Sequence, residues 1–341
     1  MTFSNSLGGL GWSAHFTAQL ELDEIDTTTP LRITEVHRSR LIATGIDGPR
    51  EVLVKDSTGD YAVGDWVLLD SEGALLRRLE RTTFLARRAA GEAVAIQAIA
   101  ANVDTLFITT SCNPDFNPAR LERYLALAAE AEVGVLLLLT KADMVENPAD
   151  WEDRARGLSA DLQVMAVNAH DPGLIDALRP WCGPGQTVAL LGSSGVGKST
   201  LLNTLTGQEQ LTAPIREVDA RGRHTTTSRA MFTMAAGGCM IDTPGMRALR
   251  LAEAAAGIDA TFSEITDLLG ECRFRDCMHE SEPGCAIQAA VAAGKLDPER
   301  LKRWRKLKDE DRYSTETIHE ARERFRKLGK VHKSAQSKKK R

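Results

Sequence analysis

The hydrophobic pattern of the chain changes near residue 95, and each half predicts a different kind of structure. Between residues 30 and 87, short apolar runs alternate with polar or glycine-containing turns. Five short strands at this spacing predict a small barrel or sandwich, and a five-stranded barrel of this size fits an OB-type fold. The expected strands cover residues 31–39, 40–46, 51–56, 66–70 and 74–80.

After residue 95, apolar runs alternate with stretches of helical period. The expected strands are 103–111, 133–140, 163–167 and 187–192, and the expected helices are 118–131, 148–160, 171–179 and one from 198. This alternation predicts a doubly wound α/β domain with a mainly parallel sheet. From about residue 258 the pattern is helical again, with two basic amphipathic helices near the end.

These changes divide the chain into five expected regions, so the fold class is multidomain. The regions are a flexible N-terminal segment at 1–29, an OB-type β-barrel at 30–90, an α/β domain at 91–256, a helical metal-binding domain at 257–330 and a disordered basic tail at 331–341.

Charge is unevenly distributed along the chain. The whole sequence has 43 basic and 47 acidic residues, for a net charge of -4. Residues 295–341, however, hold 18 Lys or Arg against 8 Asp or Glu, which leaves the rest of the chain acidic. A basic end indicates an anionic partner such as nucleic acid, and a solvated helix face is the alternative. The basic residues of the two expected helices are Lys302, Arg303, Arg305, Lys306, Lys308, Arg322, Arg324, Arg326 and Lys327.

Several protein classes are disfavoured by composition. No apolar run approaches the roughly 18 residues of a membrane span, and the N-terminus lacks the basic start and apolar stretch of a secretory signal. Six cysteines in 341 residues are too few for a disulfide scaffold. We therefore expect a cytoplasmic protein that does not contact membranes.

A phosphate-binding loop follows the apolar strand 187–192 and opens a helix. The segment GSSGVGKST matches G-x-x-x-x-G-K-[ST], in which glycines let backbone N–H groups surround a phosphate. Lys198 is expected to reach the β- and γ-phosphate oxygens, and Ser199 to bind Mg²⁺. A chance match is the alternative, but the flanking strand and helix disfavour it. The expected nucleotide-binding residues are Gly192, Ser193, Ser194, Gly195, Val196, Gly197, Lys198, Ser199 and Thr200.

Two further motifs indicate which nucleotide binds. In DTPG, Asp242 is placed to hold Mg²⁺ through water and the Gly245 N–H to contact the γ-phosphate. TKAD at the end of strand 133–140 is similar to the guanine-reading N-K-x-D motif of GTPases, with Lys141 and Asp143 present and Thr140 in place of Asn. A surface charge pair is the alternative interpretation of Lys141 and Asp143.

The order of these motifs is informative. TKAD precedes the phosphate loop, whereas ordinary GTPases have the guanine motif after it. Between them lies VNAHD, where Asn168 and Ala169 occupy the place of the element that supports guanine. One sheet can be wound in either order if its strands keep their places. The sequence therefore predicts a circularly permuted GTPase domain.

The catalytic groups are expected between the loop and DTPG, in RGRHTTTSR. Thr226, with Thr225 as the second choice, is expected to bind Mg²⁺ and the γ-phosphate. Met246 stands where ordinary GTPases have a water-orienting Gln, so His224 is our candidate to position the attacking water. The alternatives are a surface histidine and a threonine run that merely favours a strand. Lys198 completes the expected catalytic set.

A cysteine–histidine cluster follows DTPG. Cys272, Cys277, His279 and Cys285 form C-x₄-C-x-H-x₅-C, and three thiolates with one imidazole are a closed tetrahedral set suited to structural Zn²⁺. The alternative is three buried cysteines and a surface histidine. The other cysteines are expected in the core or at its edge: Cys112, Cys182 and Cys239.

Taken together, these motifs resemble the ribosome small-subunit-dependent GTPase A family (RsgA/YjeQ). IAANVDTLFIT, TKAD, GSSGVGKST, GRHTTT and DTPGM occur in that order before the Cys/His cluster. The resemblance implies an N-terminal OB domain, a central permuted GTPase and a C-terminal zinc domain. It further implies a monomer that hydrolyses GTP to GDP when stimulated by the small ribosomal subunit and its 16S rRNA, during late subunit maturation. A phosphate-loop kinase or ATPase, or an RNA-binding module with a structural nucleotide, is the alternative.

Overall fold

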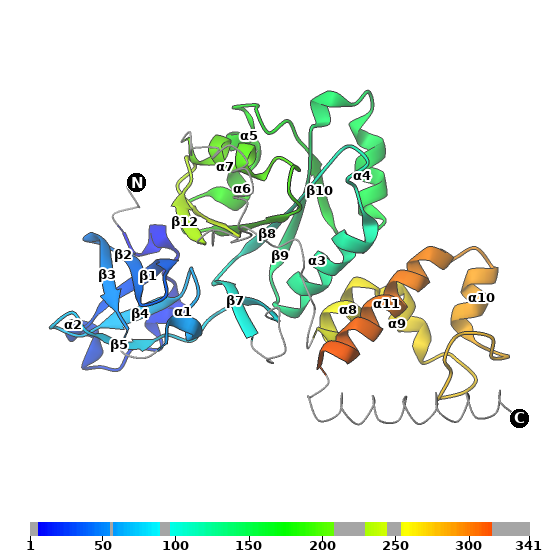
Figure 1. The fold of residues 1–341 in the computed structure, drawn as a ribbon, viewed down its shortest axis with the longest axis horizontal. Coiled ribbons are helices and arrows are strands. Elements are labelled where there is room, and N and C mark those ends of the chain that lie inside the picture. Colours follow the sequence, from blue (N-terminus) through cyan, green and yellow to red (C-terminus); the bar gives the residue numbers. More distant parts are fainter. Residues whose placement is uncertain (1–5, 55–56, 89–95, 208–228, 244–253, 316–341) are drawn as a thin grey trace, which may run out of the picture.

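The chain has a strand-rich part, a helix-covered sheet and a helical part, in that order along the sequence (Figure 1). The computed structural model describes residues 6–54, 57–88, 96–207, 229–243 and 254–315. Within these ranges, no helix has both the length and the apolar character that a membrane crossing requires.

The central sheet has the strand order β10-β9-β8-β11-β13-β12. The strands are β8 Thr105–Ser111, β9 Gly134–Thr140, β10 Gln163–Ala166, β11 Thr187–Gly192, β12 Ala230–Thr233 and β13 Cys239–Asp242. All neighbours are parallel except β12 and β13. β8 and β11 are buried along their whole length, as expected for strands covered on both faces. The predicted, mainly parallel sheet is present, and the strand of the phosphate loop lies inside it.

Helices flank this sheet: α3 Pro118–Glu130, α4 Pro148–Arg156, α5 Leu174–Ala177, α6 Arg179–Cys182 and α7 Lys198–Thr206. α3 begins where the sequence predicts, because the Asn117 side chain accepts a hydrogen bond from the Arg120 N–H and Pro118 occupies the first turn. The helix expected near 171–179 is instead two short helices. Pro180 lacks an N–H, so α5 cannot run on into α6.

The five strands expected before residue 87 are present. They are β1 Thr29–Val36, β2 Arg40–Gly45, β3 Gly48–Leu53, β4 Trp66–Leu69 and β5 Leu75–Arg78. They pair antiparallel in the order β3-β2-β1-β4-β5, and closure into an OB-type barrel stays a prediction. β1 also pairs with β12, so these strands continue the central sheet. β6 Phe84–Arg88 and β7 Ile96–Ala101, which the sequence pattern did not predict, form a separate antiparallel pair.

The segment before β1 differs from the flexible segment that the sequence predicts. Between residues 6 and 28 it forms η1 Gly8–Leu10, α1 Ala14–Thr17 and α2 Glu24–Thr27. Leu10 and Phe16 are buried in the main core, and Trp12 packs edge-on against Trp66 with ring centroids 4.9 Å apart. Each helix is only about one turn long, which is too short for a hydrophobic period in the sequence to predict it.

A buried arginine joins the N-terminal strands to the central sheet. Arg32 of β1 is 1% exposed and donates to carbonyls of Leu10 and Gly64, to the Asn102 carbonyl at 2.9 Å and to the Thr187 hydroxyl at 2.8 Å. Burial lowers the pKa of its guanidinium. Since Thr187 begins β11, this one side chain holds the N-terminal segment against the phosphate-loop strand.

The C-terminal part consists of α8 Ala255–Thr261, α9 Ser263–Leu269, α10 Ala286–Ala292 and α11 Pro298–Thr315. It is fastened to α3 by Glu122, whose fully buried carboxylate accepts from Arg300 at 2.9 Å and from Arg303 at 2.8 Å. Burial raises the pKa of Glu122, and the two guanidinium groups oppose that rise. α11 covers the first of the two predicted basic helices, and the second, with the tail, lies outside the described residues.

Candidate functional site

The phosphate loop is shaped by glycines that the local backbone requires. A Cβ at Gly192 would lie 2.3 Å from the Thr109 carbonyl oxygen of β8, so only glycine allows the strands this close. Gly195 and Gly197 have φ values of 82° and 91°, in the left-handed region where glycine is unstrained. α7 then begins at Lys198. The loop therefore presents its backbone at a helix N-terminus, which is the arrangement that binds phosphate.

Lys198 folds back across the loop. Its Nζ donates to the carbonyls of Gly192 at 2.8 Å and Ser193 at 2.6 Å. The ammonium group is thus held above the loop, where a lysine in this motif reaches the outer phosphates.

Thr140 links the TKAD segment to the phosphate loop. Its side chain is completely buried, and its hydroxyl lies 2.6 Å from the Val196 carbonyl oxygen and 3.1 Å from that of Thr110. The sequence named Thr140 as a nucleotide-binding residue, whereas its described contacts are to the backbone of the loop. Lys141 follows with a φ of 60°, and Asp143 is exposed in the one-turn helix η3 Ala142–Met144.

The VNAHD segment lies beside both TKAD and α7. The Val167 N–H donates to the Leu139 carbonyl at 2.8 Å, and its carbonyl accepts from Ala142 at 3.2 Å. The Ala169 carbonyl accepts from the Thr204 hydroxyl of α7 at 2.6 Å. Three motifs that are far apart in the sequence are therefore brought to one edge of the sheet.

Asp242 ends β13 at this same edge. It is paired in register with Leu190, two residues before Gly192. Burial raises the pKa of its carboxyl, and the charge of Lys198 opposes the rise. A carboxylate beside the phosphate loop suits Mg²⁺ bound through water. Gly245, His224, Thr225, Thr226 and Met246 lie outside the described residues, so their predicted roles are untested.

A cavity beside the phosphate loop brings residues that belong to no sequence motif next to Ser193 and Ser194 of the loop. It has a volume of about 310 Å³ and is lined by Asp115, Arg120, Tyr124, Ser193 and Ser194. Tyr124 is 2% exposed, and its hydroxyl has no hydrogen-bond partner among the described residues. Arg120 and Tyr124 lie on α3, some 70 residues before the phosphate loop in the sequence. No local motif therefore indicated that they would line a cavity beside it.

The cysteine–histidine cluster is assembled as predicted. The ligand atoms of Cys272, Cys277, His279 and Cys285 all lie within 4.8 Å of one another. His279 Nδ1 is 3.5 Å from Cys272 Sγ and 3.6 Å from Cys285 Sγ, and the two sulfurs are 4.0 Å apart. A tetrahedral Zn²⁺ with Zn–S bonds of about 2.3 Å separates its sulfur ligands by roughly 3.8 Å. The donor set and its spacing therefore fit Zn²⁺.

Residues from two helices hold this cluster in place. His279 has a φ of 62°, and its carbonyl accepts from the Gln288 side chain at 2.5 Å and from the Arg305 guanidinium. The Cys285 sulfur caps α10 by accepting from the Gln288 N–H at 3.5 Å. Trp304 is buried with its ring centroid 6.4 Å from that of His279, so it packs on the cluster instead of offering a stacking surface. Gln288 carries no sequence signal for this role.

The basic residues of α11 are less available than the sequence suggested. Arg303 binds Glu122, Arg305 binds the His279 carbonyl, and Lys308 lies 2.5 Å from Asp259. Lys302 pairs with Glu299 at 2.6 Å on the surface. Of the five basic residues predicted to follow an RNA backbone on this helix, only Lys306 is exposed with no ion pair in the described structure.

Known proteins with similar sequences are GTPases, in agreement with the geometry of this site. The family model described as RsgA GTPase matches residues 78–252. The chain is 54% identical over 319 residues to the Small ribosomal subunit biogenesis GTPase RsgA of Mesorhizobium japonicum, covering 92% of both chains. It is 46% identical over 333 residues to the Small ribosomal subunit biogenesis GTPase RsgA 2 of Vibrio vulnificus, covering 97% of this chain and 95% of that one.

Solved structures show the same fold. The chain resembles the crystal structure of YjeQ from Thermotoga maritima, with a TM-score of 0.58 and 22% identity over 82% of this chain and 97% of that one. It also resembles YloQ, described as a circularly permuted GTPase, with a TM-score of 0.57 and 22% identity over 85% and 98% of the two chains. The predicted permutation is confirmed, the protein is a GTP hydrolase, and the chain belongs to the RsgA GTPase family.

Proposed function

We propose that this protein binds the small (30S) ribosomal subunit and its 16S rRNA, and hydrolyses GTP to GDP and phosphate during late subunit maturation. The relatives at 54% and 46% identity are named as small ribosomal subunit biogenesis GTPases. The observation that carries the proposal is the convergence of the phosphate loop, TKAD, VNAHD and Asp242 at one sheet edge.

In this proposal the nucleotide-binding residues have distinct tasks. The backbone of residues 192–200 surrounds the phosphates, Lys198 contacts their outer oxygens, and Lys141 and Asp143 contact the guanine base. Asn168 and Ala169 support the base from the neighbouring loop. Ser199, Thr226 and Asp242 would hold Mg²⁺, which neutralises charge on the β- and γ-phosphate oxygens. The Gly245 N–H contacts the γ-phosphate, and His224 positions the attacking water.

The two flanking parts serve docking. We propose that residues 30–90 form an OB-type barrel and residues 257–330 a zinc domain, with one structural Zn²⁺ held by Cys272, Cys277, His279 and Cys285. Residues 331–341 supply a basic tail that binds RNA. Both ends are fastened to the GTPase domain, by Arg32 and Glu122. The protein acts as a monomer in the cytoplasm.

The test is the GTP turnover rate measured against added small subunits, with large subunits as the control. Small subunits should raise the rate, and large subunits should not. An unchanged rate would contradict the proposal and favour an RNA-binding protein whose nucleotide is structural. A parallel titration with GDP and ADP separates a GTPase from an ATPase, because Lys141 and Asp143 should favour GDP.

A further inference from the structure

A basic cavity lies at the seam between α3 of the GTPase domain and α11 of the C-terminal part. Its volume is about 220 Å³. Its lining combines four cations with three uncharged residues, Arg120, Arg123, Arg303, Lys306, Asn117, Ala119 and Leu307. No acidic and no aromatic side chain contributes to the lining. The cavity therefore offers positive charge and hydrogen-bond donors, but no platform on which a base could stack.

Two of these four cations are already neutralised within the protein. Arg123 pairs with Glu310, and Arg303 binds the buried Glu122 carboxylate through two contacts of 2.8 and 2.9 Å. Arg120 donates to the Asp115 backbone carbonyl, and neither it nor Lys306 has a carboxylate partner in the described part of the chain. Arg120 and Lys306 thus leave an excess of positive charge at the seam.

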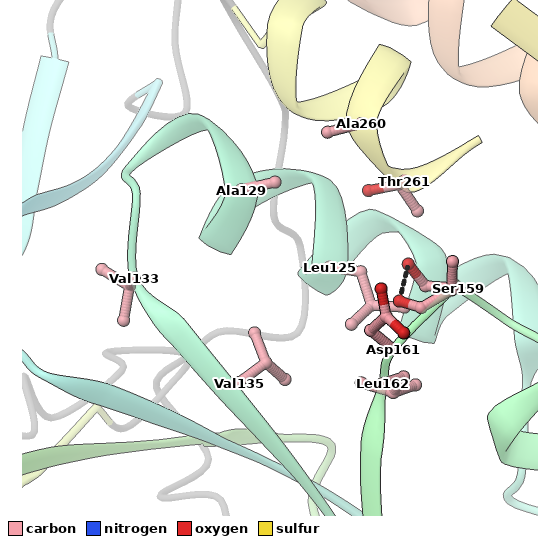
Figure 2. A pocket seen from close by; sticks show the side chains of 10 residues that line it. Leu125, Ala129, Val133, Val135, Ser159, Asp161, Leu162, Ala260 and Thr261 are labelled. Carbon is pink, nitrogen blue, oxygen red and sulfur yellow. Dashed lines mark hydrogen bonds between the residues drawn. The ribbon is translucent and has the colours of Figure 1, made fainter. Parts of the chain in front are cut away.

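A second cavity on α3 shows that this charge is specific to one flank of the helix. It also measures about 220 Å³, and Figure 2 shows it between α3, α8 and the segment before β10. Its lining is mainly apolar, with Leu125, Val133 and Val135 prominent, and its only charged member is Asp161. An anion would be repelled there, whereas the seam cavity attracts one.

We propose that the seam cavity binds a phosphate group of the RNA backbone, with Lys306 and Arg120 as its donors. The inference rests on the proposed function, because it names how this surface contacts the subunit's RNA. Contacts to phosphate position a protein on RNA without reading its sequence, which agrees with the absence of aromatic residues from the lining. Because the lining comes from both α3 and α11, the phosphate would bind only when these two parts of the protein are correctly packed together.

The test uses the full chain with a GTP analogue and purified small subunits, and measures affinity over a range of salt concentrations. Log affinity falls as log salt rises, and Lys306→Gln should make this fall less steep by about one unit of slope, the value of one phosphate contact. Its affinity deficit should shrink about threefold between 50 and 200 mM salt. Lys306→Arg keeps the charge and should retain the slope.

Lys295→Gln is the matched control, because Lys295 is exposed just before α11 and lies outside the cavity lining. GDP affinity and thermal stability should be the same in all variants, which excludes misfolding. A Lys306→Gln slope equal to that of Lys295→Gln overturns the inference. A deficit with whole subunits that is absent with protein-free RNA from those subunits also overturns it, because the partner would then be a protein. If the unmodified protein does not bind small subunits at all, the proposed function itself fails.

Discussion

Thr140 stands where the guanine-reading motif of other GTPases has asparagine, and its hydroxyl is engaged by the phosphate loop. The contact to the Val196 carbonyl at 2.6 Å joins the end of β9 to the loop across the intervening strand β8. Burial of this hydroxyl is tolerated because it is hydrogen-bonded. In the proposed function, guanine recognition is therefore assigned to Lys141 and Asp143, which follow it.

Replacing Thr140 with valine tests this role. Thr140→Val keeps the shape of the side chain but leaves the Val196 carbonyl without its donor, so the free energy of unfolding should fall by about 1–2 kcal/mol. GDP affinity should fall too, because the loop loses a support. Thr110→Val is the matched control: Thr110 is equally buried in β8, and its hydroxyl has no partner among the described residues. Equal losses in the two variants, measured by denaturant unfolding, would contradict the role of Thr140.

His224 is the candidate that positions water, since Met246 cannot. We predict that His224→Ala retains GDP and GTP-analogue affinity but loses most of the turnover that small subunits stimulate, by about 10²-fold or more. Single-turnover kinetics with and without subunits provide the measurement. Turnover that stays at the level of the unmodified protein would remove His224 from the mechanism.

At the scale of elements, α8 approaches α3 more closely than a side chain would permit. A Cβ at Gly257 would lie 2.0 Å from the Ala126 carbonyl oxygen and 2.7 Å from the Glu130 nitrogen. The Gly257 N–H also donates to the Glu130 carboxylate at 2.8 Å. This contact, with the ion pairs of Glu122, fixes the C-terminal helices on the GTPase domain.

Gly257→Ala should therefore separate the two helices and destabilise the protein by about 1–3 kcal/mol. Gly270→Ala is the control, because a Cβ there would meet nothing within 4 Å. Both substitutions remove the same backbone freedom from the unfolded chain, so their difference isolates the packing cost. The denaturant midpoint of Gly257→Ala should lie below that of Gly270→Ala, and equal midpoints would show that α8 can move without cost.

The attachment of α2 to β5 should depend on pH. Arg77 binds the Glu24 carboxylate through contacts of 2.6 and 2.9 Å, and this hydrogen bonding lowers the pKa of Glu24 from 4.5 to about 2. A carboxyl with a lowered folded-state pKa stabilises the fold above its unfolded-state value, and the contribution is lost as pH falls toward 2.

Glu24→Gln should therefore weaken the loss of stability between pH 5 and pH 3, as measured by denaturant unfolding at each pH. Asp26→Asn, on the same helix and exposed with no cation paired to it in the described structure, should leave that pH dependence unchanged. Identical profiles for Glu24→Gln and the unmodified protein would show that the Arg77 contact does not hold α2.

Elements with a strong sequence period were predictable, and partners distant in sequence were not. The helix 118–131 and the strands 133–140 and 187–192 match α3, β9 and β11 to within a residue. The charge pattern of α11, by contrast, suggested a surface for RNA. Much of that charge binds Glu122 and Asp259, and nothing local to α11 indicates that Glu122, some 180 residues earlier, would be its partner.

At the scale of the whole molecule, the cysteine–histidine cluster and the Glu122 ion pairs hold different parts of the C-terminal helices. The cluster organises residues 272–285 and caps α10, whereas Glu122 holds α11 on α3. Structural zinc supplies folding free energy to segments with few apolar residues. Loss of metal should therefore loosen the cluster and α10 but not α11.

Metal analysis should find about one Zn²⁺ per chain. Chelation should increase hydrogen exchange at 272–292 while leaving α3 and α11 protected and GDP affinity unchanged. Glu122→Gln is the converse variant: it should release α11 and retain zinc. Exchange that rises throughout the GTPase domain on chelation would contradict this division.

The order of the motifs predicted the permutation. It did not predict the buried side-chain contacts that hold the three parts of the protein together. TKAD, the phosphate loop and DTPG each carry a local signature, so their order could be found by inspection. Arg32 carries none, because an isolated arginine in a strand is usually a surface residue. Its partners Leu10, Asn102 and Thr187 are spread over the chain.

The position of β11 between β8 and β13 has a consequence for synthesis of the chain. β8, β9 and β10 are made before β11, so the edge of β8 that pairs with β11 stays unpaired while roughly 75 further residues are made. At about 5–20 residues per second, that delay lasts some 4–15 s. During that time the unpaired edge belongs to a strand that is buried along its whole length in the finished fold, and an unpaired strand edge is prone to aggregation.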